Sequence, residues 1–69
     1  MDITTKIRMA EAYVNISEAE LARRIGTTSQ AFGQRMKTGK FSSKDLENIG
    51  EALGAEIVVV IRFPDGTII

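Results

Sequence analysis

Apolar residues recur at helical spacing near the start of the chain. Ile3, Ile7, Ala10 and Val14 lie three or four residues apart, with polar residues between them. Residues at this spacing share one face of an α-helix, because the helix turns once every ~3.6 residues. We therefore expect a first helix over residues 3–14.

A second helix is predicted over residues 18–25 by a start signal and a stop signal. Ser17 has the N-cap position and Glu20 follows three residues later, which is the sequence form of a capping box. Leu21 begins the apolar face. Gly26 follows the helix, and glycine readily adopts the positive φ that a tight exit from a helix requires.

The third and fourth helices have signals of the same kind. The third is expected over residues 29–37, with Thr28 as its N-cap and Gly39 as its stop. The fourth is expected between the capping-box pattern Ser42-Asp45 and the stop at Gly54.

The sequence changes character after the fourth helix. Residues 55–69 are rich in β-branched residues, and the segment Pro64-Asp65-Gly66-Thr67 is typical of a turn. This pattern predicts a strand, a turn and a short return strand. We therefore expect one domain over residues 1–69 that is mainly α, with four helices and a C-terminal β-strand or hairpin extension over residues 55–69.

The composition excludes several kinds of chemistry. The chain has no cysteine and no histidine, which excludes thiolate chemistry, a histidine base and the usual zinc sites. The acids of the fourth helix follow the pattern of a solvated face. We expect no enzyme activity, no cofactor and no metal. The N-terminus does not resemble a secretory signal and no apolar run could span a bilayer, so we expect a cytoplasmic protein with no membrane partner.

Charge is unevenly distributed along the chain. The net charge is +0, but residues 21–44 contain six lysines and arginines and no acid. Acids predominate on both sides of this segment. A basic segment of this kind favours an anionic partner such as nucleic acid, although the whole chain is neutral.

The second and third predicted helices form a helix-turn-helix pattern, in which the second helix can enter the major groove of DNA. Residues 16–40 resemble the helix-turn-helix of the lambdoid phage repressor and Cro proteins and the wider XRE-type regulators. The matching features are Leu21-Ala22, Gly26 in the turn, Thr28 before the second helix and Phe32 as its anchor. The resemblance covers residues 3–54 and implies a four-helix, repressor-like DNA-binding domain. The chain departs from the pattern of these regulators at Arg35, a position that is usually apolar in them.

One face of the third helix carries the predicted base contacts. At about 100° per residue, Phe32, Arg35 and Ala31 fall on one side of the helix. An arc of about 140° on the other side contains Ser29, Gly33, Lys37, Gln30 and Gln34. Glutamine can pair with adenine, serine can donate or accept, and a glycine lets the helix approach a groove closely. The alternative is that such side chains decorate an ordinary solvated helix. The predicted base-contacting residues are Ser29, Gln30, Gly33 and Gln34.

Basic side chains and helix starts around this helix carry the predicted phosphate contacts. Arg35 faces inward on the helical wheel, and we expect it to snorkel or to pair with an acid rather than to contact DNA. The predicted phosphate-contacting residues are Ser17, Arg23, Thr28, Lys37, Lys40 and Lys44.

The predicted strand has two interpretations. It can cover the helical core through its own hairpin, or it can pair with the same strand of a second subunit through Ile57, Val59 and Ile61. We favour the second, because helix-turn-helix proteins commonly bind double-stranded DNA as homodimers. The sequence thus predicts a DNA-binding transcriptional regulator, a repressor that binds its operator sequence-specifically as a homodimer. The alternative is a protein-interaction module, such as an antitoxin-like partner of another protein.

Overall fold

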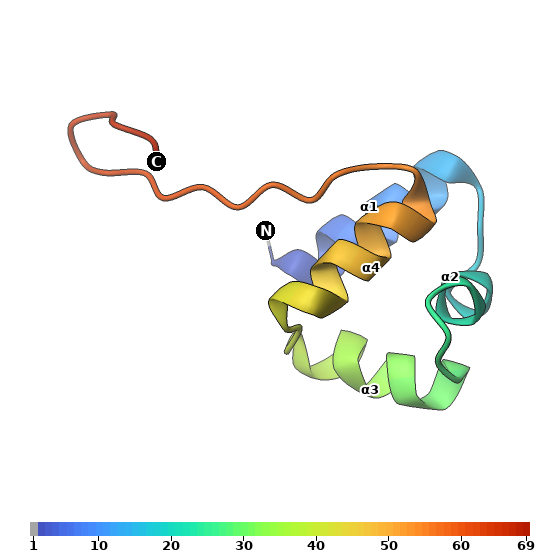
Figure 1. The fold of residues 1–69 in the computed structure, drawn as a ribbon. Coiled ribbons are helices and arrows are strands. Elements are labelled where there is room, and N and C mark those ends of the chain that lie inside the picture. Colours follow the sequence, from blue (N-terminus) through green and yellow to red (C-terminus); the bar gives the residue numbers. More distant parts are fainter. Residues whose placement is uncertain (1) are drawn as a thin grey trace.

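Helices make up most of residues 2–69, which a computed structural model of the chain describes. Within these residues there are four helices and no sheet. α1 packs against α2 and α4, and α2 packs against α3 and α4. The tail after α4 extends away from this helical part (Figure 1). The helices are α1 (Ile3–Val14), α2 (Glu18–Arg24), α3 (Ser29–Thr38) and α4 (Ser43–Leu53).

The predicted helix starts are confirmed by their capping hydrogen bonds. The hydroxyl oxygen of Ser17 accepts from the Glu20 N–H at 3.0 Å, and that of Thr28 accepts from the Ala31 N–H at 3.1 Å. Ser42 and Asp45 form a full reciprocal capping box. Such a cap satisfies an N–H that has no partner within the helix and contributes about 1 kcal/mol.

Two details of these helix ends differ from the prediction. The box expected at Ser17 is only half formed, because the Glu20 carboxylate binds arginines instead of the Ser17 N–H. α2 ends at Arg24 and α3 continues to Thr38, so each predicted end is wrong by one residue. None of the helices within residues 2–69 has the length and apolarity needed to cross a bilayer.

The turn between α2 and α3 depends on Gly26. Its φ is 78°, in the left-handed region, as predicted. The N–H groups of Gly26 and Thr27 donate to the carbonyls of Arg23 and Ala22, which closes the last turn of α2. The chain can therefore leave α2 sharply and begin α3 at Ser29.

A small apolar core holds the helices together. Leu21, Ala22 and Phe32 have no exposed surface, and Ile7 and Ile49 are buried beside them. The rings of Phe32 and Phe41 lie with their centroids 6.5 Å apart at 56°. Full burial of each large side chain contributes about 1.5–3 kcal/mol, so a few residues supply most of the apolar stabilisation.

The predicted C-terminal strand is not seen within residues 2–69, whereas the pairing of Ile57, Val59 and Ile61 with a second subunit stays a prediction. Within residues 2–69 the only β-pairing is one isolated antiparallel bridge between Arg62 and Ile68. The turn closes as expected, since Phe63 donates to the Thr67 carbonyl at 2.8 Å. Residues 57–60 have no backbone beside them within residues 2–69 to pair with, and a strand forms only where such a neighbour accepts and donates hydrogen bonds.

Gly50 determines how the tail leaves α4. A Cβ at this position would lie 3.1 Å from the carbonyl oxygen of Ala55 and 3.5 Å from the N–H nitrogen of Ile57. Glycine therefore lets the first residues of the tail cross directly over α4. Ile57 is thereby half-buried against the core, whereas the residues that follow it are exposed.

One carboxylate is buried without a partner. Glu11 on α1 is 7% exposed, and its Oε2 atom accepts no hydrogen bond within residues 2–69. Burial raises the pKa of this carboxyl, and the nearby charge of Glu18 raises it further, while Arg8 opposes both. The raised pKa means that folding makes the charged form of Glu11 less favourable than it is in the unfolded chain.

We expect Glu11→Gln to increase the free energy of unfolding at pH 7, by about 1 kcal/mol, because it removes a poorly solvated charge. The gain should shrink as the pH falls below the ordinary glutamate pKa, because Glu11 then becomes protonated in both the folded and the unfolded state. Urea unfolding at pH 7 and pH 4 measures this. An equal difference at both pH values would contradict the account.

Candidate nucleic-acid interface

The buried side of α3 determines which of its residues face outward. Phe32 and Met36 are buried one turn apart, so the opposite face of the helix is left in solvent. Gln30 and Gln34 are exposed on that face, and Ser29 is exposed at its start. Within residues 2–69 no hydrogen bond involves these three side chains. The face therefore presents two free amides and a free hydroxyl.

Gly33 lies beside this face and is half-buried. A Cβ placed there would meet nothing within 4 Å. Glycine costs an α-helix interior about 1 kcal/mol relative to alanine. Packing within residues 2–69 gives no reason for that cost, so the residue leaves a recess on the outer surface that serves no internal contact.

Two contacts hold the C-terminal half of α3 in place. The Thr4 hydroxyl on α1 donates to the Met36 carbonyl at 2.8 Å. Arg35 donates to Asp45 on α4 at 3.4 Å, so the expectation that Arg35 pairs with an acid is confirmed. The pKa of Asp45 is lowered chiefly by the backbone N–H of Ser42, with a smaller contribution from Arg35.

The predicted lysines lie at the end of α3 and the start of α4. Lys37 and Lys40 are exposed, and neither is within ion-pair distance of an acid in residues 2–69. Lys44 lies 3.9 Å from Glu47 and is partly neutralised. Lys37 and Lys40 are thus the freest of the predicted phosphate contacts.

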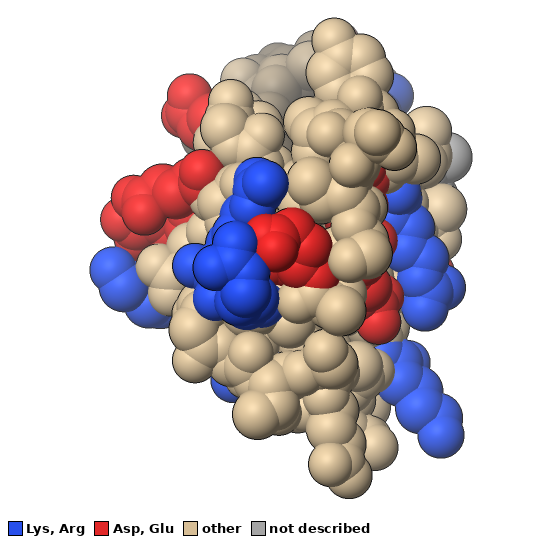
Figure 2. All heavy atoms as spheres, turned by 90° about the vertical axis from the view of Figure 1, so that its right-hand side faces the viewer, with Lys and Arg blue, Asp and Glu red and all other residues tan. Residues whose placement is uncertain are grey.

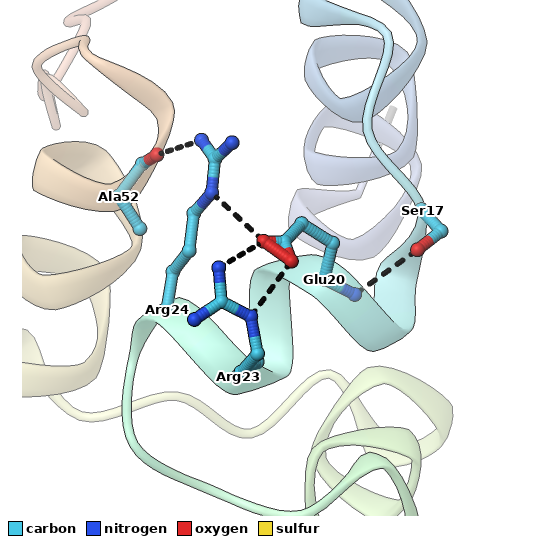
Figure 3. A network of polar contacts seen from close by, with 5 residues as sticks. All are labelled: Ser17, Glu20, Arg23, Arg24 and Ala52. Atoms are coloured by element: carbon cyan, nitrogen blue, oxygen red, sulfur yellow. Dashed lines mark hydrogen bonds and ion pairs between the residues drawn. The ribbon is translucent and has the colours of Figure 1, made fainter.

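The arginines at the end of α2 are engaged by one carboxylate, Glu20 (Figure 3). Arg23 donates from Nε to Glu20 Oε1 at 2.8 Å and from its terminal nitrogen to Oε2. Arg24 donates to Glu20 at 3.4 Å and to the Ala52 carbonyl at 3.1 Å. These arginines lower the pKa of Glu20 to about 2, chiefly through the Arg23 hydrogen bonds, so Glu20 stays charged at ordinary pH.

Sequence reasoning placed Arg23 in solvent for phosphate binding and missed this network. Arg23 remains 73% exposed at its side chain, but its guanidinium already has an anionic partner. The signal was available, because Glu20 precedes Arg23 by three residues and Arg24 by four, and such pairs are neighbours on a helix. The bond from Arg24 to Ala52 depends on tertiary packing, which spacing does not reveal.

The predicted hydroxyl contacts, Ser17 and Thr28, are exposed at helix starts. Each oxygen accepts a capping bond, and each hydroxyl hydrogen remains available as a donor. Thr28 immediately precedes the polar face of α3, whereas Ser17 precedes α2, one helix earlier in the chain. The geometry therefore groups Thr28 with Ser29 and Gln30 more closely than it groups Ser17 with them.

Figure 2 shows the face that contains α2 and the beginning of α3. Blue lysine and arginine side chains lie next to red acids in its upper half. The lower end, where α3 lies in Figure 1, is mostly uncharged. On this face, charged side chains thus gather above the beginning of α3.

No protein-family model matches this chain, and no curated protein or solved structure is significantly similar to it.

Arg24 should matter more for stability than Arg23, although both bind Glu20. Only Arg24 also bonds to α4, through the Ala52 carbonyl. We expect Arg24→Ala to lower the free energy of unfolding by about 1 kcal/mol, the typical value of such a bond. Arg23→Ala, the matched control, should have the smaller effect. Urea unfolding tests this, and equal losses would show that the bond to α4 contributes nothing.

Proposed function

We propose that this chain is a sequence-specific DNA-binding regulator of transcription, a repressor that binds its operator as a homodimer. In this proposal α2 and α3 act as a helix-turn-helix, and α3 enters the major groove. The observation that carries the proposal is the outer face of α3, where Gln30, Gln34 and Ser29 are exposed and their side chains make no hydrogen bond to any of residues 2–69. Such residues resemble the base-contacting set of XRE-type regulators.

The chemistry of this face suits the edges of bases. A glutamine amide has a donor and an acceptor in one plane, which matches N6 and N7 of adenine. A serine hydroxyl can donate or accept. Each well-placed bidentate pair discriminates against the wrong base by about 1–3 kcal/mol.

Phosphate binding in this proposal depends mainly on Lys37 and Lys40. Both are exposed and lack an acidic partner within residues 2–69. Thr28 and the first N–H groups of α3 add neutral donors at the other end of the helix. Ser17, Arg23 and Lys44 stay secondary candidates, since each is engaged within the chain or lies farther along the fold.

Gly33 gives independent support for close approach to a groove. Nothing within residues 2–69 would contact a Cβ there, so an internal packing role does not account for the glycine. A helix that must bring its backbone near base edges or a thymine methyl does account for it. The proposal thus explains a residue that stability alone disfavours.

Selection of bound duplexes from a random DNA pool tests the function. We expect a consensus with two-fold symmetry, since a homodimer reads two half-sites. Gln30→Ala or Gln34→Ala should then lose about 1–3 kcal/mol of discrimination at defined positions of that consensus. Lys37→Gln and Lys40→Gln are the matched set. Each should weaken binding to all DNA sequences alike, and should reduce by about one the slope of log binding constant against log salt concentration.

The two sets of variants separate the hypotheses. If the glutamine variants select the same consensus with the same stringency as the parent, α3 does not read bases through this face. A purified protein that is indifferent to DNA at low salt would favour the protein-interaction alternative, to which the exposed apolar tail is suited.

Gly33→Ala should separate folding from function. We expect the free energy of unfolding to rise by up to about 1 kcal/mol, because alanine favours the helix and its methyl group has open space. Affinity for the selected operator should fall at least about tenfold, because the methyl group occupies the recess that faces the groove. Thermal unfolding and fluorescence anisotropy measure the two effects. Unchanged affinity with raised stability would remove Gly33 from the interface.

A further inference from the structure

The tail exposes an apolar segment that the helical part does not cover. Val58, Val59, Val60 and Ile61 are between 56% and 76% exposed. They follow Ile57, which is half-buried against the core, so the segment begins at a fixed point on α4 and then leaves it. An extended, apolar and unpaired segment is a ready template for pairing with another strand.

The backbone of this segment has one edge free for such pairing. Ile61 exchanges both of its backbone hydrogen bonds with Ile69, at 2.7 and 2.8 Å, and Phe63 donates to Thr67. Along an extended chain, consecutive residues direct their N–H and C=O groups to opposite edges. The backbone N–H and C=O groups of Arg62 therefore point to the edge opposite residues 67–69. In an extended chain those of Val60 point to the same edge.

Charge determines the register that a second copy would adopt on this edge. In an antiparallel pair with its two-fold axis at Val59, Val58 lies opposite Val60 of the other copy, and Glu56 lies opposite Arg62. A register shifted by two residues in either direction pairs the same backbone edges, but it sets Glu56 opposite Val60 or Pro64 instead of Arg62. One register therefore pairs opposite charges at both ends of the segment.

Both charged residues are available for this pairing. Within residues 2–69 neither Glu56 nor Arg62 takes part in an ion pair. A groove between α4 and the start of the tail is lined by Glu47, Glu51 and Glu56, next to Ile57. An arginine arriving from a second copy would thus meet an acidic surface.

We propose that residues 56–62 pair antiparallel with the same residues of a second copy, with the two-fold axis at Val59 and a Glu56 to Arg62 ion pair at each end. The pairing covers the exposed valines of both copies and joins the two hairpin turns into one continuous sheet. This strand pair is the interface of the proposed homodimer. Its biological role rests on the proposed function, although the pairing itself requires no DNA.

Exchange of the two charges tests the register. Glu56→Arg alone sets arginine against arginine at both ends of the dimer, and Arg62→Glu alone sets glutamate against glutamate. We expect each single variant to dissociate at least about tenfold more readily than the parent, since like charges directly opposite destabilise a strand pair. Sedimentation equilibrium measures the constants, and far-UV circular dichroism checks that the helices are unchanged.

Two restoring experiments serve as controls. The double variant Glu56→Arg with Arg62→Glu restores opposite charges and should associate like the parent. An equimolar mixture of the two single variants should form the heterodimer in preference to either homodimer, because an arginine of one variant then faces a glutamate of the other at both ends of the pair. A parent that stays monomeric, single variants that associate like the parent, or a mixture without preference would each overturn the proposal.

DNA binding is measured separately, on the selected operator. If the charge exchange behaves as expected but no DNA consensus can be selected, the interface stands and the proposed function fails. If a two-fold consensus is selected but the charge exchange has no effect, the function stands and the dimer forms through another surface.

Discussion

Burial of Phe32 determines the orientation of α3, and the rest of the candidate site depends on that orientation. The ring has no exposed surface and lies beside Phe41, while Met36 is buried one turn later. Rotation of α3 about its axis would expose both side chains. The loss of a buried phenylalanine costs about 3–5 kcal/mol, against about 1 kcal/mol or less for a surface pair such as Arg35 with Asp45. The apolar anchor therefore outweighs the surface contacts.

The charged residues divide into those held within the chain and those left free. Glu20 holds Arg23 and Arg24, and Arg24 links α2 to the end of α4 through the Ala52 carbonyl. The same pairing reduces the positive charge at the end of α2, so the basic segment of the sequence is less basic on the surface than its composition indicates. Within residues 21–44 the free positive charge lies at Lys37, which shares the polar face of α3, and at Lys40, just beyond the end of the helix.

Local signals in the sequence predicted the helices to within one residue at each end. The capping box at Ser42 and the glycine turn at Gly26 depend only on residues a few positions apart, so the sequence contains all that they need. The missing strand could not be predicted in the same way, because pairing depends on a second backbone, and residues 57–60 have none beside them within residues 2–69.

The same distinction applies to the candidate site. Helical geometry correctly set Arg35 apart from the exposed glutamines, since the angle between residues on one helix is known in advance. The bonds from Thr4 to Met36 and from Arg24 to Ala52 join distant parts of the chain and have no local signal. The roles of Ser29, Gln30 and Gln34 in DNA reading stay predictions, because they concern a molecule outside the chain.

Side-chain amide resonances of Gln30 and Gln34, followed by NMR during titration with DNA, test the central claim most directly. The account predicts that they shift on addition of the selected operator and stay in place with a scrambled duplex of the same length. It also predicts that the Lys37 and Lys40 resonances respond to both duplexes, because phosphate is common to them. Glutamine resonances that do not move with the operator, or that move equally with both duplexes, would contradict it.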